Sequence, residues 1–175
     1  MARYVAFLRA VNVGSRRVDM GRARAVLEAL GYDDVSSYVN SGNLLFSGAG
    51  RTTAHEAAIR PALEDEFGLE LTTFVRTAAQ VRSLATEKPF GEIAQGHTHF
   101  VLLPLQKLTA AQCAAVESMS NDQDEVVVVG RDVHWLIRAR SIETSLGPKK
   151  WRDVLEGMPT TARNTTMVER LAAKL

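Results

Sequence analysis

Two short polar segments near the N-terminus carry side chains that could hold a charged ligand. Residues 12–17 read N-V-G-S-R-R and residues 40–43 read N-S-G-N, each after an apolar run. Glycine frees backbone N–H groups, asparagine offers amides, and arginine adds charge-assisted hydrogen bonds, which together suit an anion. Asp19 opposes this, because its carboxylate would compete for the N–H groups of the helix that follows. The alternative is that these asparagines and serines only cap the loops.

Arginine at position 9 stands within an apolar run that indicates a strand over residues 4–11. A buried arginine is costly unless it is paired, so we expect Arg9 to be paired, with Arg163 and Asn164 near the junction of the two halves. A structural ion pair is favoured over a ligand contact. The complete candidate ligand-binding set is Arg9, Asn12, Gly14, Ser15, Arg16, Arg17, Asn40, Ser41, Gly42, Asn43, Arg163 and Asn164.

Other chemistries find less support. His97 and His99 share one face of an expected strand, and His134 follows on another strand, but no carboxylate partner is evident, so hydrogen-bonded histidines are favoured over a zinc site. Cys113 is the only cysteine, which excludes an intrachain disulfide, and its apolar neighbours indicate an inert side chain. Residues 45–52 lack the lysine and first glycine of a phosphate loop. We therefore expect no catalytic residue, metal or cofactor.

Composition narrows the class of protein. The chain has 175 residues, 46% of them hydrophobic, and a formal net charge of +1 without a block of like charge. Near-neutrality argues against a strong attraction to nucleic acid. No apolar stretch approaches the roughly 20 residues that span a bilayer, and the N-terminus does not read as a signal peptide. We expect a soluble, cytoplasmic protein without a membrane partner.

The elements of the first half position the two polar segments. The pattern predicts strands over residues 4–11, 35–39, 43–47 and 69–76, and helices over 19–30 and 53–67 with a kink or restart at Pro61. This β-α-β-β-α-β order is that of a ferredoxin-like unit with its first and third strands central. The first and second strands then run the same way. We therefore expect the loop after the first and the turn after the second to meet at one edge of the sheet.

The second half has a similar order of elements. A helix and linker are expected over residues 77–96, a strand over 97–103, a helix over 109–119, a hairpin over 125–138, and helices over 149–155 and from 161 onward. No residue-level repeat is evident. We predict an α+β fold of two ferredoxin-like halves packed as one compact unit. Its parts are residues 1–76, the connection 77–96, and 97–175.

The pattern also predicts helix ends and the side of the first strand that meets the helices. Tyr4, Ala6, Leu8 and Ala10 share one face of that strand, and we expect the helices on this face because alanine leaves room for close packing. Asp19 is expected to cap the first helix. Capping-box spacing occurs at Thr53 and Glu56, at Thr77 and Gln80, and at Thr166 and Glu169.

Several motifs resemble one known family. They lie at residues 7–14, 37–46, 67–68, 75–77, 89–90 and 161–166. Together they resemble the domain-of-unknown-function family 1697. Ala10, Ser15 and Thr165 depart from it, where the family commonly has glycine, glycine and tryptophan. The resemblance implies a two-part α+β fold with a ferredoxin-like first half and transfers no activity.

Three functional hypotheses follow. The first is a module that binds a phosphate-bearing ligand, nucleotide or RNA at the edge formed by residues 12–17 and 40–43. The second is an enzyme using that cleft, and the third is a structural or protein-interaction module without a small ligand. A bound anion at the edge would favour the first, a deep pocket with a shifted titratable group the second, and an exposed apolar patch the third.

Overall fold

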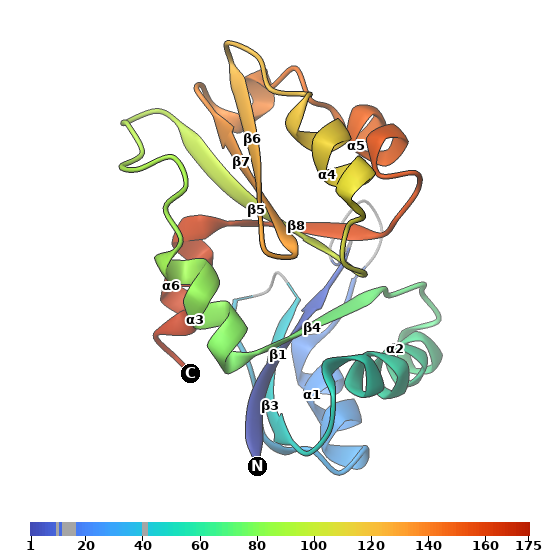
Figure 1. Cartoon of the computed structure of the whole chain (residues 1–175). Coiled ribbons are helices and arrows are strands. Elements are labelled where there is room, and N and C mark those ends of the chain that lie inside the picture. Colours follow the sequence, from blue (N-terminus) through green and yellow to red (C-terminus); the bar gives the residue numbers. More distant parts are fainter. Residues whose placement is uncertain (10, 12–16, 40–41) are drawn as a thin grey trace. The chain divides into compact units, whose positions relative to one another are not determined.

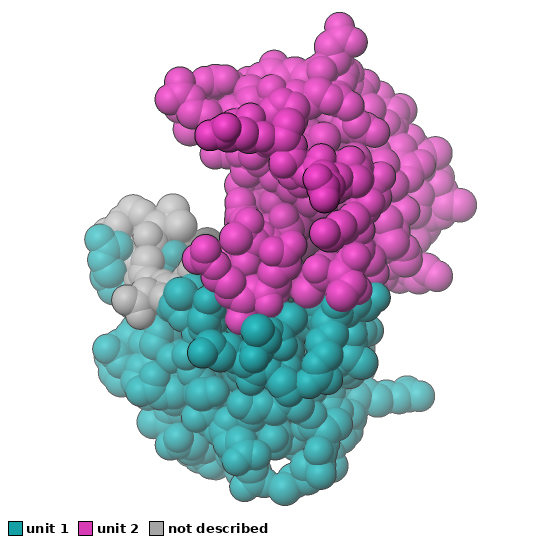
Figure 2. Space-filling view, turned by 90° about the vertical axis from the view of Figure 1, so that its left-hand side faces the viewer, with its two compact units in different colours: residues 1–83, 171–175 teal, residues 84–170 magenta. Residues whose placement is uncertain are grey.

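The computed structural model of the chain describes residues 1–9, 11, 17–39 and 42–175. It divides into two compact units, residues 1–83 with 171–175, and residues 84–170, which Figure 2 shows in different colours. Each unit contains a four-stranded sheet with antiparallel neighbours (Figure 1). The predicted α+β class with two similar halves is therefore confirmed.

The first unit follows the predicted order of elements. These are β1 (Ala2–Leu8), α1 (Met20–Ala29), β2 (Asp33–Ser37), β3 (Asn43–Gly48), α2 (Thr52–Phe67), β4 (Thr73–Thr77) and the beginning of α3 (Ala78–Thr86). The strand order is β2-β3-β1-β4, with β3 antiparallel to both β1 and β2. Strands β1 and β3 are thus central, and β1 and β2 run in the same direction, as predicted.

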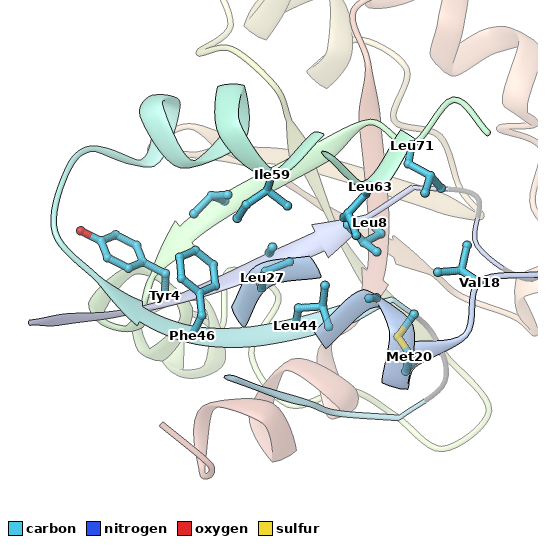
Figure 3. Close-up of a cluster of buried hydrophobic side chains, with 13 residues drawn as sticks. Tyr4, Leu8, Val18, Met20, Leu27, Leu44, Phe46, Ile59, Leu63 and Leu71 are labelled. Atoms are coloured by element: carbon cyan, nitrogen blue, oxygen red, sulfur yellow. The ribbon is translucent and has the colours of Figure 1, made fainter. Parts of the chain in front are cut away.

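The alternation of β1 places one row of its side chains in the helix-covered core of this unit (Figure 3). Tyr4, Ala6 and Leu8 cluster there with Leu27 of α1 and Ile59 of α2. Successive side chains of a strand point to opposite faces, so the alternate residues of β1 lie on the other face of the sheet. The side of β1 predicted to meet the helices is therefore confirmed.

Strand β1 is shorter than predicted. It ends at Leu8, because its neighbours begin at Asn43 and Thr73, opposite Phe7 and Leu8. Arg9 follows the strand and is exposed, so the expectation that this arginine is buried is wrong.

Among the described residues of this unit, the fully buried arginine is Arg76 of β4, with 0% of its surface exposed. Its Nη1 donates to the carbonyl of Val75 at 3.1 Å. The apolar pattern indicates a strand but does not show where the neighbouring strands begin. It therefore pointed to Arg9 as the buried arginine and not to Arg76.

Helix ends were predicted with mixed success. Asp19 caps α1 by accepting from the Arg22 N–H at 2.8 Å, and Thr77 and Gln80 form the predicted reciprocal box at the start of α3. The box expected at the start of α2 is wrong, since Glu56 accepts from the Val75 N–H of β4 at 2.8 Å. Helix α2 continues through Pro61 to Phe67 without a restart.

The second unit adds a strand that the sequence did not reveal. Its elements are the end of α3, then β5 (Thr98–Pro104), α4 (Ala110–Glu117), β6 (Asp124–Val129), β7 (Asp132–Ile137), a 3₁₀ turn (Ser141–Glu143), α5 (Pro148–Val154), β8 (Thr160–Asn164) and α6 (Thr165–Ala172). The sheet order is β6-β7-β5-β8. A helix from residue 161 was predicted, but residues 160–164 pair with β5 instead. The second half thereby has the β-α-β-β-α-β order of the first, followed by a helix.

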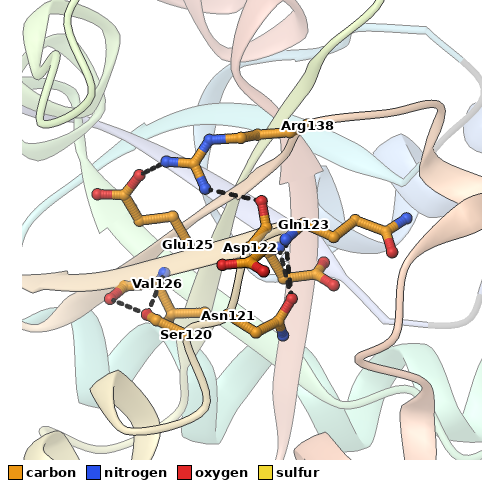
Figure 4. Close-up of polar contacts among 8 residues, drawn as sticks. Ser120, Asn121, Asp122, Gln123, Glu125, Val126 and Arg138 are labelled. Carbon is orange, nitrogen blue, oxygen red and sulfur yellow. Dashed lines mark hydrogen bonds and ion pairs between the residues drawn. The ribbon is translucent and has the colours of Figure 1, made fainter.

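Polar contacts fix the beginning of β6 (Figure 4). Asn121 Oδ1 accepts from the N–H groups of Gln123 and Asp124 at 2.9 and 3.1 Å, and Arg138 pairs with Glu125 across the hairpin. The Asn121 contacts shape the turn that leads into β6, and the ion pair links β6 to the residue that follows β7.

Asp124 itself is fully buried and accepts several hydrogen bonds. They come from Trp135 Nε1 at 2.9 Å, Thr144 Oγ1 at 2.6 Å, and the N–H and hydroxyl of Ser145 at 3.0 and 2.8 Å. The hydrogen bonds outweigh burial and lower the pKa of this carboxyl. Asp124 thus ties β6 to the segment after β7.

The two sheets also match in register, and this reveals a short repeat. Arg76 lies opposite Val5 in the first sheet, and Arg163 lies opposite Val101 in the second. From each arginine the chain continues into a helix with the spacing R-x4-V-x2-L-A, at residues 76–85 and 163–172. The expectation that no residue-level repeat exists is therefore wrong for this segment.

Candidate functional site

The second unit contains a pocket of about 410 Å³. Its walls come from the end of α3, the loop before β5, the start of β5 and the start of α6. The titratable side chains that line it are Glu87, Lys88, Glu92, His97, His99 and Glu169. Its lining is therefore mainly polar.

A chain of hydrogen bonds runs from this pocket into the sheet. His99 Nε2 lies 3.0 Å from His134 Nδ1, and His134 Nε2 lies 2.9 Å from a carboxylate oxygen of Glu87. His134 is 0% exposed and His99 is 7% exposed. Phe90 packs edge-on against the His99 ring at 5.2 Å between centroids. The two histidines are thus held by contacts on several sides.

Strand geometry explains why the histidines meet. His134 of β7 lies directly opposite Val101 of β5, and His99 is two residues before Val101 on the same face. Phe100 and Trp135 point to the other face, where they join the apolar core with Trp151. Glu87 follows α3 and reaches His134 from outside the sheet.

The partners determine where the protons lie. An ionised Glu87 only accepts, so His134 Nε2 must donate to it. A neutral His134 then accepts at Nδ1 from the N–H at His99 Nε2, which leaves the lone pair of His99 on Nδ1. Burial, and next the charge of His134, lower the pKa of His99 to about 4. His99 is therefore neutral at pH 7.

The first turn of α6 completes the pocket. Asn164 Oδ1 accepts from the Thr166 N–H at 3.0 Å, and the hydroxyl of Thr165 donates to the His99 carbonyl at 3.1 Å. Asn164 therefore begins the helix, where a capping box from Thr166 to Glu169 had been expected. Asn164, Thr165 and Thr166 all line the pocket.

In the first unit, the described residues of the predicted edge do converge. The Leu8 N–H donates to the Gly42 carbonyl at 2.7 Å. Gly42 has a φ of +77°, and a Cβ there would lie 2.8 Å from Cγ2 of Val11. Only glycine fits such a backbone at such close range. The end of β1 and Val11 thus lie against Gly42, in the turn between β2 and β3.

The other residues predicted to bind a ligand differ in their burial and in their partners. Asn43 is fully buried and its amide donates to the Tyr38 carbonyl at 3.0 Å, while Arg17 is exposed. Arg163 donates through Nη1 to Thr161 Oγ1 at 2.7 Å and to the Ala162 carbonyl at 2.9 Å, and burial lowers its pKa to about 10. Asn12, Gly14, Ser15, Arg16, Asn40 and Ser41 lie outside the described residues.

Sequence reasoning missed Glu87. The alternation of His97 and His99 was visible, but the carboxylate that completes the chain lies 47 positions from His134. In the described part of the chain, no group of three or more His, Cys, Asp or Glu side chains is placed to hold a metal ion. Within the same described residues, no helix is long and apolar enough to cross a membrane.

Comparison with known proteins gives a family and a fold. A solved structure of the conserved bacterial protein SP0830 from Streptococcus pneumoniae matches with a TM-score of 0.81 and 20% identity, covering 100% of this chain and 98% of that one. Such identity supports the fold alone. No curated protein matches the chain. The family model described as "Protein of unknown function (DUF1697)" matches residues 1–134, and the chain therefore belongs to the DUF1697 family.

Proposed function

We propose that the protein binds a small polar molecule in the pocket of the second unit, in contact with His99. One observation carries this proposal: the hydrogen-bonded chain from Glu87 through His134 ends at His99 on the wall of a pocket of about 410 Å³. Ligand pockets combine such a volume with a few oriented polar groups and titratable residues of shifted pKa. This arrangement supports the enzyme hypothesis, at a site other than the one the sequence indicated.

The charges of the lining indicate the class of ligand. The lining contains carboxylates from Glu87, Glu92 and Glu169 and the positively charged ammonium group of Lys88. The acidic excess favours a neutral or cationic molecule over a phosphate. The hydroxyls of Thr165 and Thr166 and the lone pair of His99 add hydrogen-bonding groups for such a ligand.

Amide NMR shifts test this class. We would titrate the full chain with ethanolamine, glycerol and inorganic phosphate as cationic, neutral and anionic probes. Saturable shifts centred on Thr98, His99 and Thr166 with ethanolamine, and weaker shifts with phosphate, are expected. Glu169→Gln should weaken the ethanolamine response. Glu143→Gln, at an exposed glutamate outside the pocket lining, is the matched control and should leave it unchanged.

Two outcomes would overturn the proposal. Stronger pocket shifts with phosphate than with ethanolamine would show that the ligand class is wrong. No shift at these amides with any probe at millimolar concentration would show that the pocket does not bind small polar molecules.

An anion site in the first unit is a second candidate. The convergence of Leu8, Val11 and Gly42 at one edge of the sheet supports it. The buried amide of Asn43, already bonded to Tyr38, supports turn chemistry instead. Phosphate-induced shifts at Gly42 that disappear in an Asn12→Ala/Arg16→Ala double variant would favour the anion site. Their absence would favour turn chemistry.

A further inference from the structure

His134 is fully buried between a second histidine and a carboxylate. A pair of histidines can share one proton in either of two positions. Protonation of His99 would place the charge on a ring whose Nε2 already faces a histidine. Protonation of His134 would place it next to Glu87, where opposite charge favours it.

We infer that His99 and His134 act together as one general base for a molecule bound in the pocket. His99 Nδ1 takes the proton, His99 Nε2 passes its own proton to His134 Nδ1, and the positive charge rests on His134 beside Glu87. The inference deepens the proposed function, since it needs that pocket to hold the proton donor. His99 is the catalytic residue, and His134 and Glu87 are positioning residues.

The step balances without an oxidant, a reductant or a further reactant. The bond to hydrogen in the bound molecule breaks and its electron pair stays on that molecule. An N–H bond forms at His99 Nδ1 while the one at Nε2 breaks and another forms at His134 Nδ1. The substrate class is therefore a small neutral or cationic molecule with a weakly acidic hydrogen on oxygen, nitrogen or an activated carbon.

The geometry and the surrounding charges support this direction of transfer. The distances of 3.0 and 2.9 Å are those of ordinary hydrogen bonds, so each proton can move along an existing contact. The low pKa of His99 opposes a lasting charge on that ring. Glu92 and Glu169 from the pocket walls favour uptake of a proton, and Lys88 from the same lining opposes it. Arg163 also opposes it, since it lies on β8 opposite Val101, the residue that His134 faces from β7. His97 is the remaining titratable side chain of the lining.

Nitrogen-15 NMR of the histidine side chains tests the relay in the apo full chain between pH 4 and 9. At the high end, both rings should carry their proton on Nε2. As the pH falls, His134 should become doubly protonated and His99 should change to the Nδ1–H form at one shared midpoint. His99 should become charged only near pH 4. Charging of His99 before His134, or an unchanged His99 tautomer, would overturn the relay.

Glu87→Gln separates the charge of Glu87 from its role as an acceptor. Glutamine keeps an oxygen for His134 Nε2 but removes the negative charge, so the His99 tautomer should change at a lower pH than in the unmodified chain. Glu92→Gln also removes a carboxylate from the pocket lining but not from contact with His134, and should shift the midpoint less. Equal shifts in the two variants would contradict the role of Glu87.

A carbon acid tests use of the base. In 5-nitrobenzisoxazole, removal of the C–H proton forms a nitrile and breaks the N–O bond, releasing a coloured phenolate. The rate should follow the shared midpoint, move with it in Glu87→Gln, and be lost in His99→Gln. No acceleration over buffer would overturn the catalytic role.

The two proposals fail in different ways. The NMR titration of the apo protein needs no ligand, so a wrong relay appears there even if the pocket binds ethanolamine. A failed proposal of ligand binding appears as absent amide shifts even if the tautomers change as expected.

Discussion

The two halves of the chain share an aromatic pair at the same place in their sheets. Tyr4 of β1 lies opposite Phe46 of β3, with ring centroids 5.5 Å apart. Phe100 of β5 lies opposite Trp135 of β7, at 5.7 Å. Both pairs lie on the side of the sheet that joins the main apolar core. The core of one half is therefore a variant of the core of the other.

The opposite faces of the sheets differ. Where Leu45 lies opposite Val5 in the first half, His134 lies opposite Val101 in the second. The histidine can be buried because Glu87 and a second histidine satisfy its nitrogens. The fold thus accepts either an apolar or a polar residue at this position, and the chemistry there depends on the partners supplied from outside the sheet.

Alanine substitutions in the two aromatic pairs should cost the most stability, and they test whether the two cores are equivalent. Phe46→Ala and Trp135→Ala should each cost about 3–5 kcal/mol, because both leave a cavity among buried side chains. Urea unfolding followed by amide NMR measures each half separately. Phe46→Leu and Trp135→Phe serve as milder controls. A cost below about 1 kcal/mol for either alanine variant would show that the halves are not built alike.

Asp124 and Asp34 sharpen the comparison at the edge strands. Asp124→Asn should cost about 3 kcal/mol, since an amide cannot accept all the hydrogen bonds that the buried carboxylate accepts. Asp34 is exposed and accepts from Ser47 Oγ at 3.0 Å, so Asp34→Asn should cost less than about 1 kcal/mol. The free energy of unfolding of each variant measures these costs. Equal costs for the two substitutions would contradict the difference expected between the two aspartates.

Both halves contain a buried histidine whose pKa is lowered by burial, His55 in the first and His99 in the second, and the pKa of His99 falls to about 4. An unfolded histidine titrates near 6.5, whereas folded His99 titrates at about 4, so the unfolded state binds more protons between these values. Stability should therefore fall by up to about 3 kcal/mol as the pH drops through this range.

Urea unfolding followed by tryptophan fluorescence measures this loss, because both tryptophans, Trp135 and Trp151, belong to the second half. Asp124 should change the stability only at lower pH. Because the pKa of this carboxyl is lowered in the folded state, its contribution to stability is kept until the pH falls below about 4. A His99→Gln variant with the same pH dependence as the unmodified chain would disprove the assignment.

Alanine substitutions at the two equivalent helix starts should cost less stability than those in the cores. Thr77→Ala and Asn164→Ala should each cost about 1 kcal/mol, because each removes an oxygen that accepts from a first-turn N–H group. Thermal unfolding measures both. Only Asn164→Ala should also alter the amide shifts that ethanolamine induces in the pocket. An identical response to ethanolamine in the two variants would show that Asn164 does not contribute to ligand binding in the pocket.

Local patterns predicted most of the fold. Alternation identified the side of β1 that meets the helices, and residue types identified the caps at Asp19 and Thr77. The pattern failed at residues 160–164, because a helix was predicted from residue 161 and pairing with β5 makes a strand of this segment. Pairing between distant segments is a tertiary effect that outweighs local propensity.

The candidate site was harder to predict for the same reason. His97 and His99 were predicted to share a strand face, but nothing local connects His99 to His134, 35 positions away, or His134 to Glu87. The sequence therefore indicated the residue types and not the chain of contacts. Arg76 shows the same limit, since its burial follows from the strands around it.

The irregular pairing of β2 has a consequence for the behaviour of the protein in concentrated solution. The register between β2 and β3 shifts between Asp33 and Ser36, and Asp34 has a φ of 50°. Strand β2 is the outermost strand of its sheet, where a regular row of free backbone groups would recruit another chain. The bulge and the neighbouring acidic side chains break that row, so this border resists growth of the sheet by edge-to-edge aggregation.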